Sequence, residues 1–192
     1  PFWRACERAG APPARPRAAP AALAPPAAWP SSAPLASLGL AAPPVGADGT
    51  PGRDWAGPML AHWDVSERAS RRAMRAFVRG DGLAGYELRR SRADERGTVS
   101  TLSPYLRFGM LSARELHHAV RDSGLDRALT KTFARRLHWR DLAYYQLHVF
   151  PRMADAPIRA HYAEHAWSDD APARLALWKR GRTGYPMVDA GM

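Results

Sequence analysis

Residues 130–151 read TKTFARRLHWRDLAYYQLHVFP, and this stretch predicts a long helix that decides the fold. The helix is expected from about Thr130 to Phe150, because Pro151 cannot extend the backbone hydrogen-bond ladder. Arg136, Trp139 and Arg140 follow one another at i, i+3 and i+4, which places an indole and two guanidinium groups on one face. Such a face suits a nucleotide, since bases stack on indoles and cations pair with phosphates. A core tryptophan flanked by snorkelling arginines would give the same pattern.

Three further helices are expected on both sides of this one. Ser66 is a candidate N-cap and Gly80 a candidate stop for the first. Its apolar face would consist of Ala69, Ala73, Ala76 and Phe77. Four arginines form a second stripe on it, suited to solvent or to phosphate: Arg68, Arg72, Arg75 and Arg79.

The second of these helices begins with a capping box, in which Ser112 and Glu115 satisfy two free amides, and ends near Gly124. The third is short and lies between Asp170 and Gly181. Pro172 stands in its first turn, and Leu175 and Trp178 are expected to point inward. No stretch alternates as a strand does. The fold class predicted for the folding part is all-α, with long irregular connections.

Composition separates this helical part from the first 56 residues. Most of the 18 prolines lie before residue 59. From Pro12 to Pro51 the chain is dominated by Ala, Pro, Ser and Gly, which predicts an extended linker. We therefore expect a Pro/Ala-rich linker over 1–56 and a single helical domain over 57–192. The chain begins without a methionine and stops at Met192, so we expect both ends to be cuts.

Charge and cysteine content narrow the class of protein. The net charge is +10, almost wholly from arginine, which supports a nucleic-acid partner. A coding bias toward arginine would explain the same excess. Cys6 is the only cysteine, which excludes a disulfide framework or a cysteine-based zinc site. No apolar run reaches the length of a membrane span, and the histidines form no metal-binding pattern. We predict no metal and no membrane.

Hydroxyl groups are concentrated in TVSTLSPYL, residues 98–106. Hydroxyls and backbone amides in such a loop can bind a pyrophosphate. Serine and threonine runs are also common in ordinary turns and caps, so the loop alone leaves both interpretations open.

Three blocks, taken in order, resemble the DNA photolyase/cryptochrome family. Residues 100–106 (STLSPYL), followed by Phe108-Gly109 and Leu111-Ser112, look like its flavin-phosphate loop. Residues 133–150, with Leu137 and Trp139-Arg140-Asp141, look like the helix that lines its cofactor and DNA cavity. Trp178, Gly181 and residues 183–192 (TGYPMVDAGM) look like the opening of its central FAD-binding core. The resemblance covers nearly all of residues 57–192 and implies the first part of that family's helical FAD-binding domain.

The resemblance also implies roles for single residues. The residues implied to bind FAD are Tyr86, Val99, Ser100, Thr101, Leu102, Ser103, Phe133 and Arg140. Those implied to face DNA are Arg90, Arg136, Leu137, His138, Trp139 and Asp141, with Trp139 stacking on a flipped dimer. Trp167 matches the outer tryptophan of the chain that passes electrons to the flavin. A second, antenna chromophore would bind a domain outside this sequence.

The implied activity is light-driven repair of cyclobutane pyrimidine dimers in DNA by electron transfer from reduced FAD, by a monomer. Two positions depart from the family pattern: Val99 replaces a threonine, and Arg136 replaces a glutamate that accepts hydrogen bonds from the dimer. Arg136 gives weight to a cryptochrome photoreceptor that acts on a signalling protein. A basic helical nucleic-acid-binding module without cofactor is the third hypothesis. The sequence leaves nucleus, cytoplasm and chloroplast open, and we expect this piece alone to bind FAD weakly or not at all.

Overall fold

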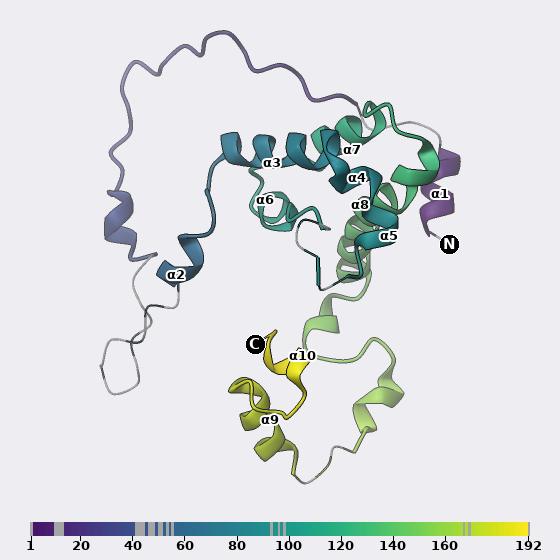
Figure 1. Ribbon diagram of the computed structural model, residues 1–192. Helices are drawn as coiled ribbons and strands as arrows, with labels where there is room; N and C mark the ends of the chain where they lie inside the picture. The colour runs from purple at the N-terminus through teal and green to yellow at the C-terminus, as the bar shows by residue number, and fades with distance from the viewer. Residues whose placement is uncertain are drawn as a thin grey trace. The chain divides into compact units, whose positions relative to one another are not determined.

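The computed structural model describes residues 2–9, 14–40, 45, 49, 52, 54, 56–92, 94–95, 97, 99–166, 168 and 170–191. It divides into two compact units, Pro1–Asp141 and Leu142–Met192. The regular elements within the described residues are helical (Figure 1). The predicted all-α class is therefore confirmed.

The first unit contains most of the helices. They are α1 (Phe2–Ala9), the 3₁₀ turn η1 (Leu35–Leu38), α2 (Ala56–Leu60), α3 (Glu67–Arg79), α4 (Asp81–Ala84), α5 (Tyr86–Arg89), α6 (Ser103–Arg107), α7 (Ala113–Arg121) and the first part of α8 (Arg127–Val149). Helix α3 packs against α4 and α7. Residues 14–34 have no regular structure and are exposed.

The second unit begins within α8, after Asp141. It holds the end of that helix, η2 (Pro151–Ala154), η3 (Ala160–Glu164), α9 (Ala171–Lys179) and α10 (Pro186–Asp189). No described side chain of this unit is buried. Our prediction that Leu175 and Trp178 point inward is therefore wrong: they are 48% and 46% exposed. The reason is that the unit, taken by itself, provides no core for them to enter.

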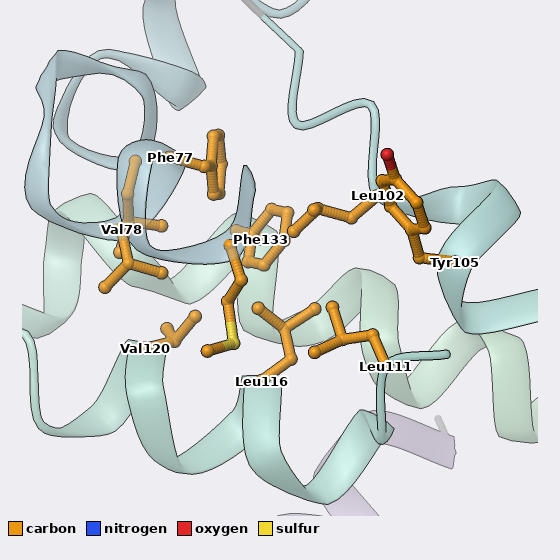
Figure 2. Close-up of a cluster of buried hydrophobic side chains, with 10 residues drawn as sticks. Phe77, Val78, Leu102, Tyr105, Leu111, Leu116, Val120 and Phe133 are labelled. Carbon is orange, nitrogen blue, oxygen red and sulfur yellow. The ribbon is translucent and has the colours of Figure 1, made fainter. Parts of the chain in front are cut away.

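Among the described residues of the first unit, ten side chains form one hydrophobic core (Figure 2). It consists of Met74, Phe77, Val78, Leu83, Leu102, Tyr105, Leu111, Leu116, Val120 and Phe133. Of the apolar face predicted for α3, Ala69 and Phe77 are buried and Ala73 packs on the core, but Ala76 is exposed. Met74 and Val78 take the inward positions instead, because the buried stripe of α3 is rotated from the one predicted.

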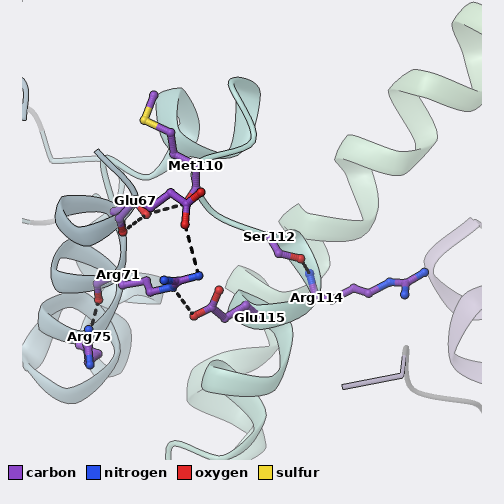
Figure 3. A network of polar contacts seen from close by, with 8 residues as sticks. Glu67, Arg71, Arg75, Met110, Ser112, Arg114 and Glu115 are labelled. Atoms are coloured by element: carbon purple, nitrogen blue, oxygen red, sulfur yellow. Dashed lines mark hydrogen bonds and ion pairs between the residues drawn. The ribbon is translucent and has the colours of Figure 1, made fainter. Parts of the chain in front are cut away.

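Polar contacts fix α3 against α7 (Figure 3). The buried Ser70 hydroxyl lies 2.7 Å from the carbonyl oxygens of Met110 and Glu67. The guanidinium of Arg71 lies 3.3 Å from the Glu115 carboxylate. Ser112 caps α7 as predicted, accepting a hydrogen bond from the Arg114 amide, but the Glu115 carboxylate, expected to complete a capping box, pairs with Arg71. Glu115 thus contributes to the link between the helices.

Candidate functional site

Two of the residues expected at the cofactor meet at the edge of the core. The ring of Tyr86, at the start of α5, lies 5.2 Å from that of Phe133 on α8, edge to face. Phe77 of α3 contacts both rings, at 6.1 Å and 4.8 Å. Tyr86 thus packs edge to face on both phenylalanines, whereas the two phenylalanine rings are tilted against each other by 46°. Tyr86 remains half-buried, whereas Phe133 is buried.

We define the hydroxyl loop as residues 99–103, directly before and at the start of α6. Leu102 anchors it: its side chain is 1% exposed and belongs to the core cluster that also contains Phe133. Figure 2 shows the Leu102 and Phe133 side chains in this cluster. The loop and α8 therefore fold onto one core. The Leu102 side chain thus fixes the loop to that core.

The backbone of the hydroxyl loop is strained at Thr101. Its φ of +52° lies in the left-handed region, which a β-branched residue rarely adopts. The Thr101 hydroxyl donates to the carbonyl of Ser100 at 2.7 Å, and the Leu102 amide donates to the Ser100 hydroxyl at 3.4 Å. The Val99 side chain is exposed, and Thr98 lies outside the described residues. Strain of this kind is concentrated at functional sites.

Helix α8 presents its predicted site residues on two neighbouring faces. Phe133, Leu137 and Arg140 follow at i, i+4 and i+7 and share one face. Phe133 and Leu137 pack on the core, so Arg140 continues the core-facing stripe. Its guanidinium is partly exposed and lies 3.9 Å from the Asp141 carboxylate.

The second face of α8 carries a half-exposed indole that lies close to two guanidinium groups. Trp139 is 48% exposed. The guanidinium carbon of Arg136 lies over its ring, 4.6 Å from the centroid, and that of Arg135 lies at 5.9 Å. Both distances are within the range of a cation–π interaction. The predicted pairing of Trp139 with Arg136 is thus present, whereas the second cation is Arg135, which the sequence interpretation missed.

The remaining residues expected to face DNA have separate surroundings. The His138 ring donates its Nδ1–H to the Ala134 carbonyl at 3.0 Å and packs edge-on against Trp3 of α1 at 4.6 Å. The Nε of Arg90, after α5, is buried without a hydrogen-bond partner among the described residues. Asp141 is exposed. Trp167 lies outside the described residues, so its predicted electron-transfer role stays a prediction.

Histidines gather where α7 meets α8. The rings of His117 and His118 lie 5.4 Å apart, and those of His117 and His138 lie 6.3 Å apart. Burial lowers the pKa of His117, and the neighbouring histidines and Arg121 lower it further. Across the described part of the chain, no three His, Cys, Asp or Glu residues are placed to hold a metal ion. Nor is any described helix long and apolar enough to cross a bilayer.

The donor chemistry of the first unit fits an anionic dinucleotide. The hydroxyl loop offers three side-chain hydroxyls, and the neutral Tyr86–Phe133 pair adjoins the same core. Arg140 adds a positive charge on the core-facing stripe of α8. Hydroxyl and guanidinium donors are the groups that bind phosphates, and aromatic rings suit a flat heterocycle. The residues present thus include both kinds of group that FAD binding requires.

Comparisons with known proteins agree with this chemistry. Residues 133–192 match the family model described as the FAD binding domain of DNA photolyase. The chain is 33% identical, over its whole length, to the deoxyribodipyrimidine photo-lyase of Agrobacterium fabrum, of which it spans 38%. It is 32% identical over 139 residues, 68% of the chain and 20% of the relative, to Cryptochrome-1 of Arabidopsis thaliana.

A solved structure shares the fold. The crystal structure of a bacterial class III photolyase from Agrobacterium tumefaciens superimposes with a TM-score of 0.84 at 30% sequence identity. The match covers 99% of this chain and 37% of that protein. The helical arrangement is therefore that of part of a photolyase.

Proposed function

The chain belongs to the photolyase/cryptochrome family, and we propose that the protein that carries it is a light-driven flavoprotein that repairs cyclobutane pyrimidine dimers in DNA. The observation that supports this most directly is the pair of faces on α8. One face carries Arg140 in line with Phe133 and Leu137, which pack on the core that also anchors the hydroxyl loop, and the next carries the exposed Trp139 indole. A cofactor face beside a base-stacking face is the arrangement that the reaction requires.

Each group in this chain has a defined task in the proposed reaction. The hydroxyl loop and Arg140 hold the pyrophosphate of FAD by charge-assisted hydrogen bonds, and Tyr86 packs against the cofactor. When bound, reduced FAD would supply the electron that splits the dimer and would take that electron back from the repaired bases. Trp139 stacks on the flipped lesion, whose extrusion costs less than that of an intact pair because it is already poorly stacked. Trp167 belongs to the route by which the flavin is reduced.

Binding of DNA is favoured by the positive charge of the same helix. Arg135 and Arg136 stand beside Trp139, in a chain of net charge +10. Arginine pairs with phosphates in a bidentate manner, which orients the strand as well as attracting it. We propose damaged DNA as the partner on this ground.

One observation favours a second candidate, a cryptochrome photoreceptor that signals to a protein partner. Arg136 stands beside the stacking face, and a guanidinium has no acceptor for the N–H of a thymine ring. A repair enzyme with an acceptor at this place would bind the lesion edge more completely. The similarity to Cryptochrome-1 is compatible with this alternative.

Blue-light repair of an oligonucleotide that carries one thymine dimer tests the proposal. The protein that carries this chain should restore the intact thymines under blue light and not in the dark. Trp139→Ala should reduce repair by about tenfold, since a base–aromatic stack contributes roughly 1–3 kcal/mol. Trp29→Ala is the matched control, because Trp29 is an exposed indole of the linker and should leave repair unchanged.

Binding of FAD is measured separately by its yellow absorbance after purification. Arg140→Gln should lower flavin occupancy, while Arg79→Gln, an exposed arginine of α3, should not. Stoichiometric flavin without any repair in light would contradict the repair function and support the photoreceptor function. Absence of flavin would contradict both the repair enzyme and the photoreceptor. The hypothesis of a nucleic-acid-binding module without cofactor would then remain.

A further inference from the structure

The stacking face of Trp139 is already occupied in this structure. Arg136 lies one helical turn before it and places its guanidinium carbon 4.6 Å from the ring centroid. A base that stacks on this face of an indole would use the space that the guanidinium fills. Stacking there therefore requires Arg136 to move.

The cations beside the indole lack neutralising partners in the described part of the chain. The recorded ion pairs join neither Arg135 nor Arg136 to a described carboxylate. The Nε of Arg135 is buried without a hydrogen-bond partner among these residues. By contrast, Arg71 and Arg72 of α3 are each paired with an acid. No described carboxylate thus neutralises the Arg136 guanidinium that lies over Trp139.

These two observations have opposite consequences for different ligands. A neutral base gains the stack but displaces a favourable cation–π contact, so it binds weakly. A base within a phosphodiester strand offers the guanidinium a phosphate in exchange. Displacement then costs little, because Arg136 leaves one partner for a stronger one.

We propose that Arg136 is a specificity-determining residue that admits a base to Trp139 only when the base is part of a phosphodiester strand. The inference rests on the proposed function, because Trp139 is the stacking platform in both. The inference adds a role for Arg136, which stands where the resemblance predicts a hydrogen-bond acceptor. Arg136 makes the protein bind nucleic acid in preference to free nucleosides and other neutral aromatic compounds. Its side chain covers the indole in the unbound protein and contacts the backbone phosphate in the complex.

The test compares two probes in the dark, so that neither light nor repair enters. The first probe is a fluorescently labelled oligothymidylate, and the second is the same oligomer with uncharged methylphosphonate linkages. Binding to each is measured by anisotropy between low and high salt, with the protein that carries this chain and its variants. Arg136→Met keeps the bulk of the side chain without the charge, and Arg79→Met on α3 is the matched control.

For the charged probe, Arg136→Met should bind more weakly at low salt and reduce the slope of log K against log salt by about 0.7, one phosphate contact on a single strand. For the uncharged probe it should bind about threefold tighter than the parent, the equivalent of one exposed cation–π contact. Arg79→Met should leave binding of the uncharged probe unchanged. Arg136→Lys should retain the slope.

The tighter binding of the uncharged probe by Arg136→Met must disappear when Trp139→Ala is also present, because the indole that Arg136 covers is then absent. If Arg136→Met weakens both probes alike, or if its effect is unchanged by Trp139→Ala, the proposal is overturned and Arg136 is an ordinary surface cation. Circular dichroism of each variant confirms that the helices are intact. A protein that follows this pattern in the dark but repairs nothing in light would contradict the proposed function alone.

Discussion

Replacing Thr101 with glycine is expected to separate the stability of the hydroxyl loop from its binding function. The backbone of Thr101 has a φ of +52°, where the Cβ atom of an L-residue costs about 1–2 kcal/mol. Glycine removes this cost. Its greater conformational freedom in the unfolded chain lowers the free energy of unfolding by about 0.4–1 kcal/mol. Thr101→Ala keeps the Cβ atom and loses the hydroxyl and the γ-methyl group. We therefore expect Thr101→Gly to be more stable than Thr101→Ala by about 1 kcal/mol.

Urea unfolding followed by far-UV circular dichroism measures this difference. The binding arm uses FAD occupancy of the protein that carries this chain. A hydroxyl that donates to a phosphate contributes about 1.5–3 kcal/mol, so both variants should bind roughly tenfold or more weakly, while Thr101→Ser should bind normally. Equal stability of the glycine and alanine variants would refute the left-handed backbone. Normal FAD binding by both would refute the hydroxyl contact.

Three further changes test the fold. Leu116→Ala should lower the free energy of unfolding by about 2–5 kcal/mol in a urea titration, because its side chain is 0% exposed; Leu88→Ala, at 85% exposed, should change it by no more than about 0.5 kcal/mol. Ser66→Ala should cost about 1 kcal/mol, since its hydroxyl accepts the Ala69 amide at 3.1 Å and caps α3; a smaller loss than from an exposed serine elsewhere would contradict the cap. Burial, and then the neighbouring histidines, hold the pKa of His117 below its usual 6.5. Protonation therefore favours the unfolded chain, and stability should be full above pH 6.5 and fall as the pH drops through 6.5 toward the folded pKa. His117→Gln should flatten this fall, and an unchanged pH profile would show that His117 is not the group responsible.

The parts of the fold that the sequence predicted are those governed by local chemistry. Ser66 and Ser112 cap α3 and α7, and Pro151 follows the end of α8, as expected. The start of α8 was placed three residues too late. The Asp126 carboxylate accepts a hydrogen bond from the Ala128 amide at 2.7 Å, a cap that the search for apolar periodicity overlooked.

The missed parts are short or depend on tertiary contact. Helices α4, α5 and α6 have four or five residues each, too few to show a helical period. Helix α1 lies within the segment interpreted as linker, where Trp3 packs on His138 and Glu7 pairs with Arg127. Contacts between residues more than 100 positions apart leave no local pattern in a single sequence.

For the candidate site, the sequence predicted which kinds of residue lie on α8 better than it predicted which of them contact one another. The interpretation of α8 placed Arg136, Trp139 and Arg140 on one face. The structure instead pairs the indole with Arg136 and Arg135, while Arg140 continues the stripe of Phe133 and Leu137. A spacing of i+3 or i+4 allows contact, but the rotamer decides which neighbour makes it.

The period of α8 explains how one rigid element can serve two chemical tasks. Seven residues after Phe133, Arg140 returns to nearly the same direction, whereas six residues after it Trp139 points about 120° away. The rise between Phe133 and Trp139 is about 9 Å, so a base on the indole and a cofactor beside the core would lie on adjacent sides of one rod. Because Phe133 is fixed by Phe77 and Tyr86, the position of the indole is set by the core rather than by a flexible loop. The Arg136 guanidinium over the indole can still move. A substitution of Arg136 can therefore change which ligands bind Trp139 without disturbing the face of α8 that carries Phe133 and Arg140.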